Sequence, residues 1–542
     1  MKVSHDFEYD VIVLGSGLTG AHIAHDAALR GLRTLWLTES DIVGESLSWD
    51  KLLLQYVHPL DPFQSSQCTL HNDEVNILRQ RAHHLLSQTP LLVPVFHPSR
   101  STFFQRTKHT LGELLRAKVS MHRYNSFSKL AKHQGVFLRE QDWNTSSFGI
   151  RNEGCDYLSS KEWMISHHRW VLGVALSARE AGVTIQSYTE VEDWVRTASG
   201  KVRGVYARDI LTSERQRYTS YTVVNARSFL PDTIDKEVKW NQRLRFKRQV
   251  HLLVEQQLPF ALQFKNDEHQ TLSITPQNNS ICLSWSDPSV FLLPEMLEPN
   301  HQDVLRVMEL GSKLIPSLKQ RKLLRCYSTI SKFVVSSKFD EKKLPGYHVS
   351  HHKKQGMDGL FSSSISLPIW ARKCAEEVVD RLCKSLKIRA FCTTVESKLV
   401  GGESDFPTIE ELNKEFSLPK SSISALIGRH GDKSYGILFD SQRTRDGLSH
   451  LCQSLHITVG ELRYCLEHEW IRKPENLIRS IGLGLEPNLG TASLLPASRL
   501  LQKTFIELSL QNIITSIEDE LHKYQTPVLF GQTLQQKIIS RS

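Results

Sequence analysis

Three glycines near the start of the chain have the spacing of a phosphate-binding turn. The segment Gly15-Ser16-Gly17-Leu18-Thr19-Gly20 has the pattern GxGxxG. In this pattern the first glycine allows a tight turn and the second lets a pyrophosphate approach the backbone. The third lets a helix pack close to a strand. The first amides of that helix would donate hydrogen bonds to the phosphate, helped by the helix dipole.

The elements around the glycines fall in the order that this chemistry requires. The apolar run Val11–Leu14 predicts a strand buried on both faces of a parallel sheet. A helix is predicted over Ala21–Arg30 with Gly31 as its stop, and a second strand over Arg33–Leu37. The sequence therefore predicts a βαβ unit with a dinucleotide site at its first turn. The alternative is a βαβ unit whose glycines serve packing only.

The contact to a ribose is less well defined by the sequence. A carboxylate is expected at the end of the second strand, where it would bind the ribose hydroxyls. Thr38 holds that position, and the nearest carboxylate is Glu39. A shift of one residue at a strand end turns a side chain to the other face of the sheet. Glu39 is therefore the ribose residue of the dinucleotide interpretation, and its displacement supports the packing interpretation.

Composition favours a globular protein without a membrane span. The 542 residues have room for about two to four domains. No apolar run approaches the roughly 20 residues of a membrane helix, and the charged N-terminus MKVSHDFEYD lacks a signal-peptide core. We expect a cytoplasmic protein, with peripheral contact to a membrane left open.

Net charge and cysteine content limit the kinds of binding partner and metal site that are expected. The net charge of +9 suits an anionic ligand or an anionic membrane surface. Nucleic acid is not expected, because no basic run with interleaved aromatic residues is present. None of the nine cysteines forms a CxxC pair. The adjacent histidines of each His-His pair would point in different directions, so we predict no metal site.

Periodicity along the remaining chain predicts alternating helical and β-rich regions. Helices are expected over Asp73–Ser87, Arg106–Lys118, Ser166–Gly182, residues 301–318 and Ala371–Lys387. Strands are expected over Lys201–Asp209, Arg217–Ala226, Arg243–Val254 and Leu272–Ser286. After a linker at 401–407 the chain is predicted to be mostly helical, with helices over Thr408–Phe416, Ser421–Leu426, Ile457–Trp470 and Ala497–Tyr524.

Four segments together resemble one family. They are residues 10–37, residues 166–185, residues 202–226 ending in Val-Asn-Ala, and residues 461–485 with His468-Glu469-Trp470. Their order is similar to that of the FAD-dependent glycerol-3-phosphate dehydrogenase family, the quinone-linked respiratory type. The likeness runs from about residue 8 to about residue 485.

The resemblance implies an α/β fold with a divided architecture. A Rossmann-like FAD-binding domain would span residues 1–400, with an inserted antiparallel β-rich substrate domain at roughly 75–160 and 240–350. A C-terminal helical cap domain would span residues 401–542.

The resemblance also implies an activity. A hydride would pass from C2 of glycerol 3-phosphate, a phosphorylated polyol, to FAD, and the electrons would pass on to quinone. A base must take the hydroxyl proton and cations must hold the phosphate. Family members lie on the cytoplasmic face of a membrane, so the same place is implied for this chain.

The family's site residues are carried over position by position. His251 falls where the family has an active-site histidine and is expected to transfer the proton, with a hydrogen-bonded histidine of the sheet as the alternative. Arg248 and Lys332 are expected at the substrate phosphate. The residues expected at FAD are Gly15, Ser16, Gly17, Thr19, Gly20, Glu39, Ser46 and Lys51.

The departures from the family gather in the loops that touch flavin and substrate. A pair of glycines is replaced by Gln55 and Tyr56, and two arginines are replaced by His58 and Ser331. Side chains in place of glycines would intrude on a flavin ring. Two alternatives to the dehydrogenase therefore stay open: a catalytically lapsed relative that acts as a binding or assembly protein, and an FAD enzyme with a different substrate.

Overall fold

The protein is described from a computed structural model. It defines residues 8–44, 51–54, 65–96, 136–138, 148–150, 155–227, 244–265, 270–286, 298–334, 346–486 and 493–531. The predicted helix over Arg106–Lys118 lies outside these residues. Among the described residues, no helix combines the length and the apolar character needed to cross a bilayer.

The first sheet carries the glycine turn. Its strands lie in the order β16 (Tyr347–His351), β17 (Leu360–Ile365), β10 (Arg215–Asn225), β1 (Tyr9–Leu14), β2 (Thr34–Leu37) and β7 (Thr184–Gln186). The five strands from β17 to β7 are parallel, and β16 is antiparallel at the edge. The predicted buried strand is confirmed, because Val11–Leu14 are at most 1% exposed.

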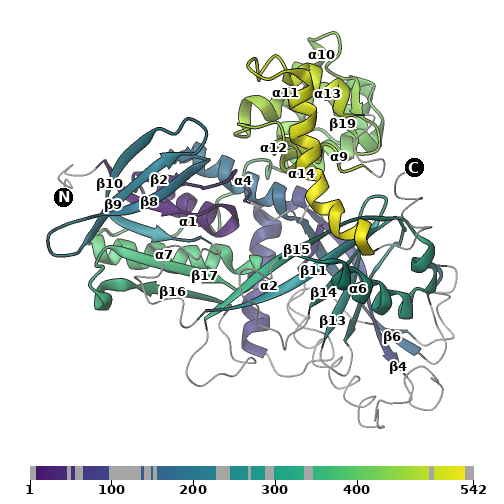
Figure 1. The fold of residues 1–542 in the computed structure, drawn as a ribbon, viewed down its shortest axis with the longest axis horizontal. Helices are drawn as coiled ribbons and strands as arrows, with labels where there is room; N and C mark the ends of the chain where they lie inside the picture. Colours follow the sequence, from purple (N-terminus) through teal and green to yellow (C-terminus); the bar gives the residue numbers. More distant parts are fainter. Residues whose placement is uncertain are drawn as a thin grey trace.

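Each face of this sheet is covered by a different layer. The helices α1 (Gly17–Leu29), α4 (His167–Glu180) and α7 (Ala371–Leu386) pack on the face that carries Val11 and Val13. The hairpin of β8 (Thr189–Arg196) and β9 (Val202–Asp209) continues into β10 and covers Ile12 and Leu14 on the other face (Figure 1). This alternation along β1 follows from the two-residue period of a strand.

The second sheet is mostly antiparallel. Its strands lie in the order β15 (Leu323–Val334), β11 (Leu244–Val254), β14 (Ile281–Ser286), β13 (Thr271–Pro276), β12 (Ala261–Lys265), β4 (Leu86–Phe96), β6 (Cys155–Ser166) and β3 (Lys51–Leu53), with β5 (Val136–Leu138) beside β6. Helix α6 (His301–Leu314) packs against β11, β13 and β14 over an apolar core. The region predicted as a strand over Leu272–Ser286 is a hairpin of β13 and β14.

The C-terminal region is helical. It holds α8 (Ile409–Phe416), α9 (Lys420–His430), α10 (Lys433–Gln442), α11 (Val459–His468), α12 (Asn476–Ile481), α13 (Leu494–Leu501) and α14 (Leu510–Gly531), with a small sheet of β18 (His450–Cys452) and β19 (Ile457–Thr458). Helix α14 leaves this group and reaches β15 and α6 (Figure 1). The described architecture agrees with the predicted α/β class with a helical C-terminal region.

Several predicted helices have different bounds in the structure, as three examples show. Helix α1 begins at Gly17 rather than at residue 21. The helix predicted over Asp73–Ser87 is α2 (Ser65–Arg81), and the chain then enters β4 at Leu86. The helix predicted over Ala497–Tyr524 is divided into α13 and α14, because Ser509 caps a new helix by accepting from the amide of Asn512 at 3.1 Å.

Candidate functional site

The turn after β1 is built so that only glycine fits. Gly15 has a φ of +114°, and a Cβ placed on it would lie 2.7 Å from the backbone nitrogen of Arg227. A Cβ on Gly20 would lie 2.2 Å from the carbonyl oxygen of Gly15, so the helix approaches the strand as closely as the pattern predicts. Gly17 has a φ of +81°, and a Cβ there would meet only Val43 O at 3.5 Å. The turn therefore keeps backbone, not side chains, at the start of α1.

Trp36 stabilises this turn through a hydrogen bond and was not among the predicted site residues. The indole Nε1 donates a hydrogen bond to the carbonyl oxygen of Gly15 at 2.8 Å, and Trp36 is fully buried in β2. This bond fixes the carbonyl of a residue in an unusual backbone conformation. The signal available in the sequence is a single indole within the otherwise small or aliphatic strand Thr34–Leu37.

The segment after β2 folds back onto the start of α1. The amide of Gly17 donates to the carbonyl of Ile42 at 3.0 Å, and the amide of Gly44 donates to Asp41 Oδ1 at 2.8 Å. Asp41 in turn forms a buried ion pair with Arg479 of α12. The loop beside the glycine turn is therefore fastened to the C-terminal helices.

The side chains of Ser16 and Thr19 flank the turn. Ser16 is the N-cap residue of α1, and its side chain makes no capping hydrogen bond. Thr19 lies in the first turn of the same helix and is half-buried. Both residues are thus at the helix N-terminus where the sequence places a phosphate.

At the end of β2 the two neighbouring residues face different environments. Thr38 is fully buried, and its hydroxyl donates to the carbonyl of Ser40 at 2.8 Å. The side chain of Glu39 is 30% exposed and forms an ion pair with Arg227 at 3.0 Å. The carboxylate is therefore near the end of β1 in spite of the shift by one residue. It is engaged by an arginine that was not among the predicted site residues.

Lys51 lies on the second sheet, and Ser46 falls outside the described residues. Lys51 pairs with Ser166 between β3 and β6, and its amide donates to Gln277 Oε1 at 2.8 Å. Its ammonium group is 3.4 Å from the hydroxyl of Ser87. Burial lowers the pKa of Lys51 below its ordinary value.

His251 is enclosed within the second sheet. Its Nδ1 is 2.8 Å from the hydroxyl of Ser284 on β14, and its Nε2 is 2.8 Å from the hydroxyl of Thr329 on β15. The ring stacks on Tyr327 with centroids 4.8 Å apart. Burial lowers the pKa of His251 to about 3, so the imidazole is neutral at pH 7. This geometry favours the structural alternative, and the role in proton transfer stays a prediction.

Of the two predicted substrate cations, Arg248 is held away from His251, and the side chain of Lys332 lies outside the described part of the structure. Arg248 pairs with Asp303 of α6 at 2.8 Å and also donates to the carbonyl of Glu298 at 2.9 Å. The backbone of Lys332 is opposite Phe246 in the β11–β15 ladder. The described side-chain contacts therefore assign Arg248 to the capping region of α6.

The register of β11 separates Arg248 from His251. Residues three apart on a regular strand point to opposite faces of the sheet. Val250 and Leu252 share the face of Arg248 and lie in the core beneath α6. His251 faces the other side, so the structure does not bring these two predicted residues into one site.

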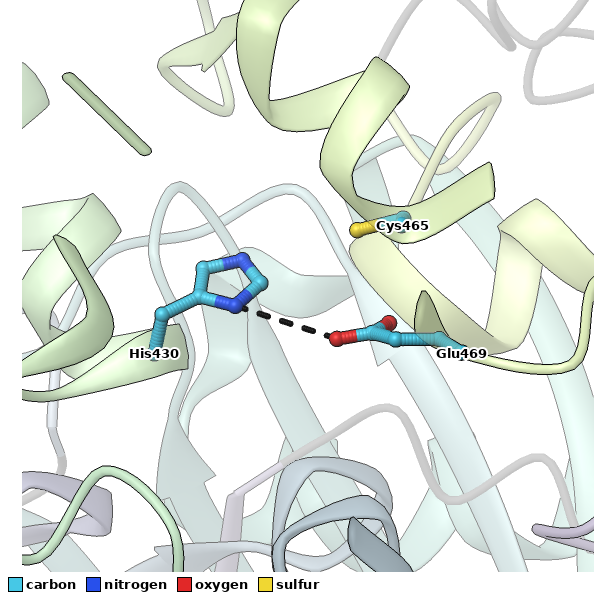
Figure 2. Close-up of side chains that lie close together, drawn as sticks. All are labelled: His430, Cys465 and Glu469. Carbon is cyan, nitrogen blue, oxygen red and sulfur yellow. Dashed lines mark ion pairs between the residues drawn. The ribbon is translucent and has the colours of Figure 1, made fainter. Parts of the chain in front are cut away.

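A second cluster has the residue types of a metal site. Figure 2 shows His430, Cys465 and Glu469 facing one another, and their ligand atoms lie within 4.8 Å. Two nitrogens of Arg169 bind the carboxylate of Glu469 at 2.8 and 2.9 Å, and one is 3.1 Å from His430 Nδ1. The other ring nitrogen of His430 is 2.9 Å from Glu461. The guanidinium already provides the cation, so this buried cluster joins α4 to the C-terminal helices and is not assigned a metal.

Comparison with known proteins identifies the sequence family. The sequence profile of a family described as FAD dependent oxidoreductase matches residues 10–358. One chain of the anaerobic glycerol-3-phosphate dehydrogenase of Escherichia coli (strain K12) is 25% identical, and the alignment covers 100% of this chain and 97% of that protein. The aerobic glycerol-3-phosphate dehydrogenase of Staphylococcus haemolyticus is 24% identical and is matched over 88% of this chain and 87% of that protein.

Comparison with solved structures supports the fold. The glycerol-3-phosphate dehydrogenase from Bacillus halodurans, solved in complex with FAD, superposes with a TM-score of 0.73 at 19% identity. The superposition covers 97% of this chain and 96% of that one. The L-α-glycerophosphate oxidase from Mycoplasma pneumoniae, solved with FAD bound, superposes with a TM-score of 0.53 over 71% of this chain and 96% of that one, at 13% identity. The arrangement of two sheets and a helical C-terminal region is therefore that of a known flavoprotein fold.

Proposed function

Because the chain belongs to the family of FAD-dependent oxidoreductases, we propose that it oxidises glycerol 3-phosphate with FAD held at the glycine turn. The observation that carries the proposal is the geometry of that turn. Side chains are excluded at Gly15 and Gly20 by backbone contacts, and the start of α1 is left lined by backbone. A diphosphate fits a surface of this kind, because amides and the helix dipole favour negative charge there.

The residues assigned to the cofactor follow from the turn. Gly15, Gly17 and Gly20 would let the diphosphate approach the backbone at the start of α1, with Ser16 and Thr19 at its side. Bound FAD supplies the acceptor for the hydride from C2 of the substrate.

Three further residues are assigned along the cofactor. Glu39 would accept hydrogen bonds from the ribose of the adenosine half. Ser46 and Lys51 are proposed for the flavin ring, on the strength of the family resemblance.

The substrate is proposed from the relatives more than from side-chain geometry. Proteins named glycerol-3-phosphate dehydrogenase align with the full length of the chain, which supports a phosphorylated polyol. His251 is proposed for proton transfer and Lys332 for the phosphate. Arg248 is a weaker choice, since its charge is already balanced by Asp303.

Anaerobic reduction of the bound flavin tests this function. Addition of glycerol 3-phosphate should bleach the oxidised flavin spectrum, and glycerol without the phosphate should not. Equal bleaching by both compounds, or bleaching by neither, would contradict a phosphorylated polyol as substrate.

A second function has one observation in its favour. Both ring nitrogens of His251 already have hydroxyl partners, and burial lowers the pKa of His251 to about 3. A catalytically lapsed relative would retain this saturated arrangement together with the fold. It would bind FAD and remain oxidised under glycerol 3-phosphate and under other hydroxy acids and polyols.

The electron acceptor is proposed to be quinone, as the family resemblance implies. That acceptor would bring the protein to a membrane surface as a peripheral partner on the cytoplasmic side. Reoxidation of the substrate-reduced flavin by a short-chain ubiquinone analogue, faster than by dissolved oxygen, is the expected result. Oxidation at equal rates would count against the quinone.

A further inference from the structure

An ion pair bridges the two strands on either side of the glycine turn. Leu14 at the end of β1 pairs with Asn225 of β10 and with Leu37 of β2. Arg227 and Glu39 each follow their strand by two residues, and Arg227 Nη1 is 3.0 Å from Glu39 Oε1. The pair therefore spans the carboxyl end of β1, which is the edge of a parallel sheet where nucleotides bind.

The two partners differ in how firmly they are held. The side chain of Arg227 is 4% exposed, and both its Nε and its amide donate to Asn225 Oδ1 at 3.1 and 3.2 Å. Its backbone lies directly against Gly15. The side chain of Glu39 is 30% exposed. The arginine is thus part of the fixed framework, and the carboxylate is the accessible end of the pair.

Glu39 requires such an anchor because Thr38 occupies the buried position at the strand end. A half-exposed glutamate without a partner would sample several rotamers and lose entropy on binding a ligand. A carboxylate beside a diphosphate would also experience like-charge repulsion, which an adjacent guanidinium offsets.

We propose that Arg227 is a positioning residue for the adenosine ribose. It holds the Glu39 carboxylate over the end of β1, so that the carboxylate accepts hydrogen bonds from the ribose hydroxyls of the dinucleotide. This role rests on the dinucleotide site proposed above, and it compensates for the displacement of the carboxylate from residue 38 to Glu39. Arg227 itself need not touch the ribose.

Calorimetric titration with ADP and with 2′-deoxy-ADP tests the role. The full-length chain, freed of co-purifying flavin, should bind ADP about tenfold more tightly than 2′-deoxy-ADP, because the deoxy analogue lacks one hydroxyl for Glu39. Glu39→Gln and Arg227→Ala should each reduce this ratio to about twofold or less. Arg227→Lys should retain an intermediate ratio, since lysine keeps the positive charge but lacks the planar guanidinium that can bind with several nitrogens.

Arg33→Ala is the matched control. Arg33 pairs with Asp10 at 3.0 Å, the same length as the Arg227–Glu39 pair, but at the opposite end of β1 and β2. Its loss should leave the ratio of ADP to 2′-deoxy-ADP affinity unchanged. Circular dichroism verifies that each variant is folded, and Glu39→Gln tests the same contact if Arg227→Ala does not fold.

The outcomes separate this inference from the proposed function. If the wild-type chain binds neither nucleotide, the dinucleotide site is wrong and the role of Arg227 falls with it. If the chain binds both nucleotides equally, only the role of Arg227 and Glu39 is overturned. Tighter ADP binding by Arg227→Ala would also overturn it, because the ion pair would then be an obstruction.

Discussion

At the end of β1 three glycines keep side chains away from the turn, whereas His251 in the middle of β11 has a side-chain partner on each ring nitrogen. In the first region the indole of Trp36 bonds the carbonyl of Gly15, and the backbone of Arg227 lies against Gly15. In the second region the hydrogen-bonding capacity is used within the protein. The two regions differ in what surrounds their polar groups: the turn keeps side chains away from its backbone, whereas the ring of His251 is enclosed by side-chain partners.

The largest effect is expected for FAD binding at the glycine turn, where Gly17→Ala and Gly31→Ala distinguish a lost ligand contact from backbone strain. Gly17→Ala should weaken FAD binding on the order of 100-fold or more, because the new methyl group would stand where the diphosphate meets the backbone. Gly31→Ala is the control, since Gly31 has a φ of +79° against +81° at Gly17 and open space for a Cβ. Both variants should lose about 1–2 kcal/mol of stability from the left-handed backbone. Equal FAD affinity in the two variants, measured by fluorescence titration, would place the diphosphate elsewhere.

His251→Ala tests the second region. Removing the ring takes the imidazole partner from the buried hydroxyl of Ser284 and the partly buried hydroxyl of Thr329, so the free energy of unfolding should fall by about 2–3 kcal/mol. Turnover per folded molecule should fall by less than about tenfold if the role is structural, and by roughly 100-fold or more if His251 is the general base. Urea titration and initial rates give the two quantities. The exposed His301 provides the control variant His301→Ala, which should change neither.

The free energy of unfolding should fall steeply as the pH is lowered below 6.5. Burial lowers the pKa of His25, His84 and His251 to about 3 in the folded protein, with Arg81 contributing at His25 and His83 at His84. In the unfolded chain a histidine titrates near 6.5, so only the unfolded state takes up protons as the pH falls below that value. Stability is therefore full above pH 6.5 and lost towards pH 3, by up to about 1.4 kcal/mol per pH unit for each histidine.

Urea titration at several pH values tests whether His251 contributes to this pH dependence. His251→Ala should flatten the dependence of unfolding free energy on pH between 6 and 4 by the contribution of one histidine. An unchanged slope would mean that His251 is not held neutral in the folded protein, which would strengthen its claim to a catalytic role.

The smallest expected effect concerns the support beneath the glycine turn. Trp36→Phe keeps an aromatic ring but removes the hydrogen bond to the Gly15 carbonyl, so FAD binding should weaken by about fivefold and stability should fall by about 1 kcal/mol. Trp194→Phe is the control, because the buried Nε1 of Trp194 makes no hydrogen bond within the described part of the chain. A loss of FAD affinity in both variants alike would assign the effect to general packing.

The glycine turn could be predicted because its requirements are local. The strand, the three glycines and the helix lie within residues 9–29, and each glycine is needed by backbone geometry alone. Arg227 could not be found in the same way, since its partner Glu39 is 188 residues distant. The same applies to the fate of His251, whose hydroxyl partners come from two other strands and are defined only by the register of the sheet.

Element bounds show a similar limit. Helical periodicity continues from α2 past Arg81, although the chain turns there and enters a strand paired along its whole length with β6. The division of Ala497–Tyr524 into two helices depends on a capping hydrogen bond at Ser509. The spacing of apolar residues does not reveal such a cap. Pairing and capping outweigh periodicity at both places.

The proposed function depends on FAD lying with its diphosphate across the start of α1. Absorption spectroscopy of the purified full-length chain, before and after reconstitution with excess FAD and desalting, tests it most directly. The wild-type chain should retain flavin in stoichiometric amount, and the flavin should be lost in Gly17→Ala and kept in Gly31→Ala. A colourless chain that takes up no FAD under these conditions would contradict it.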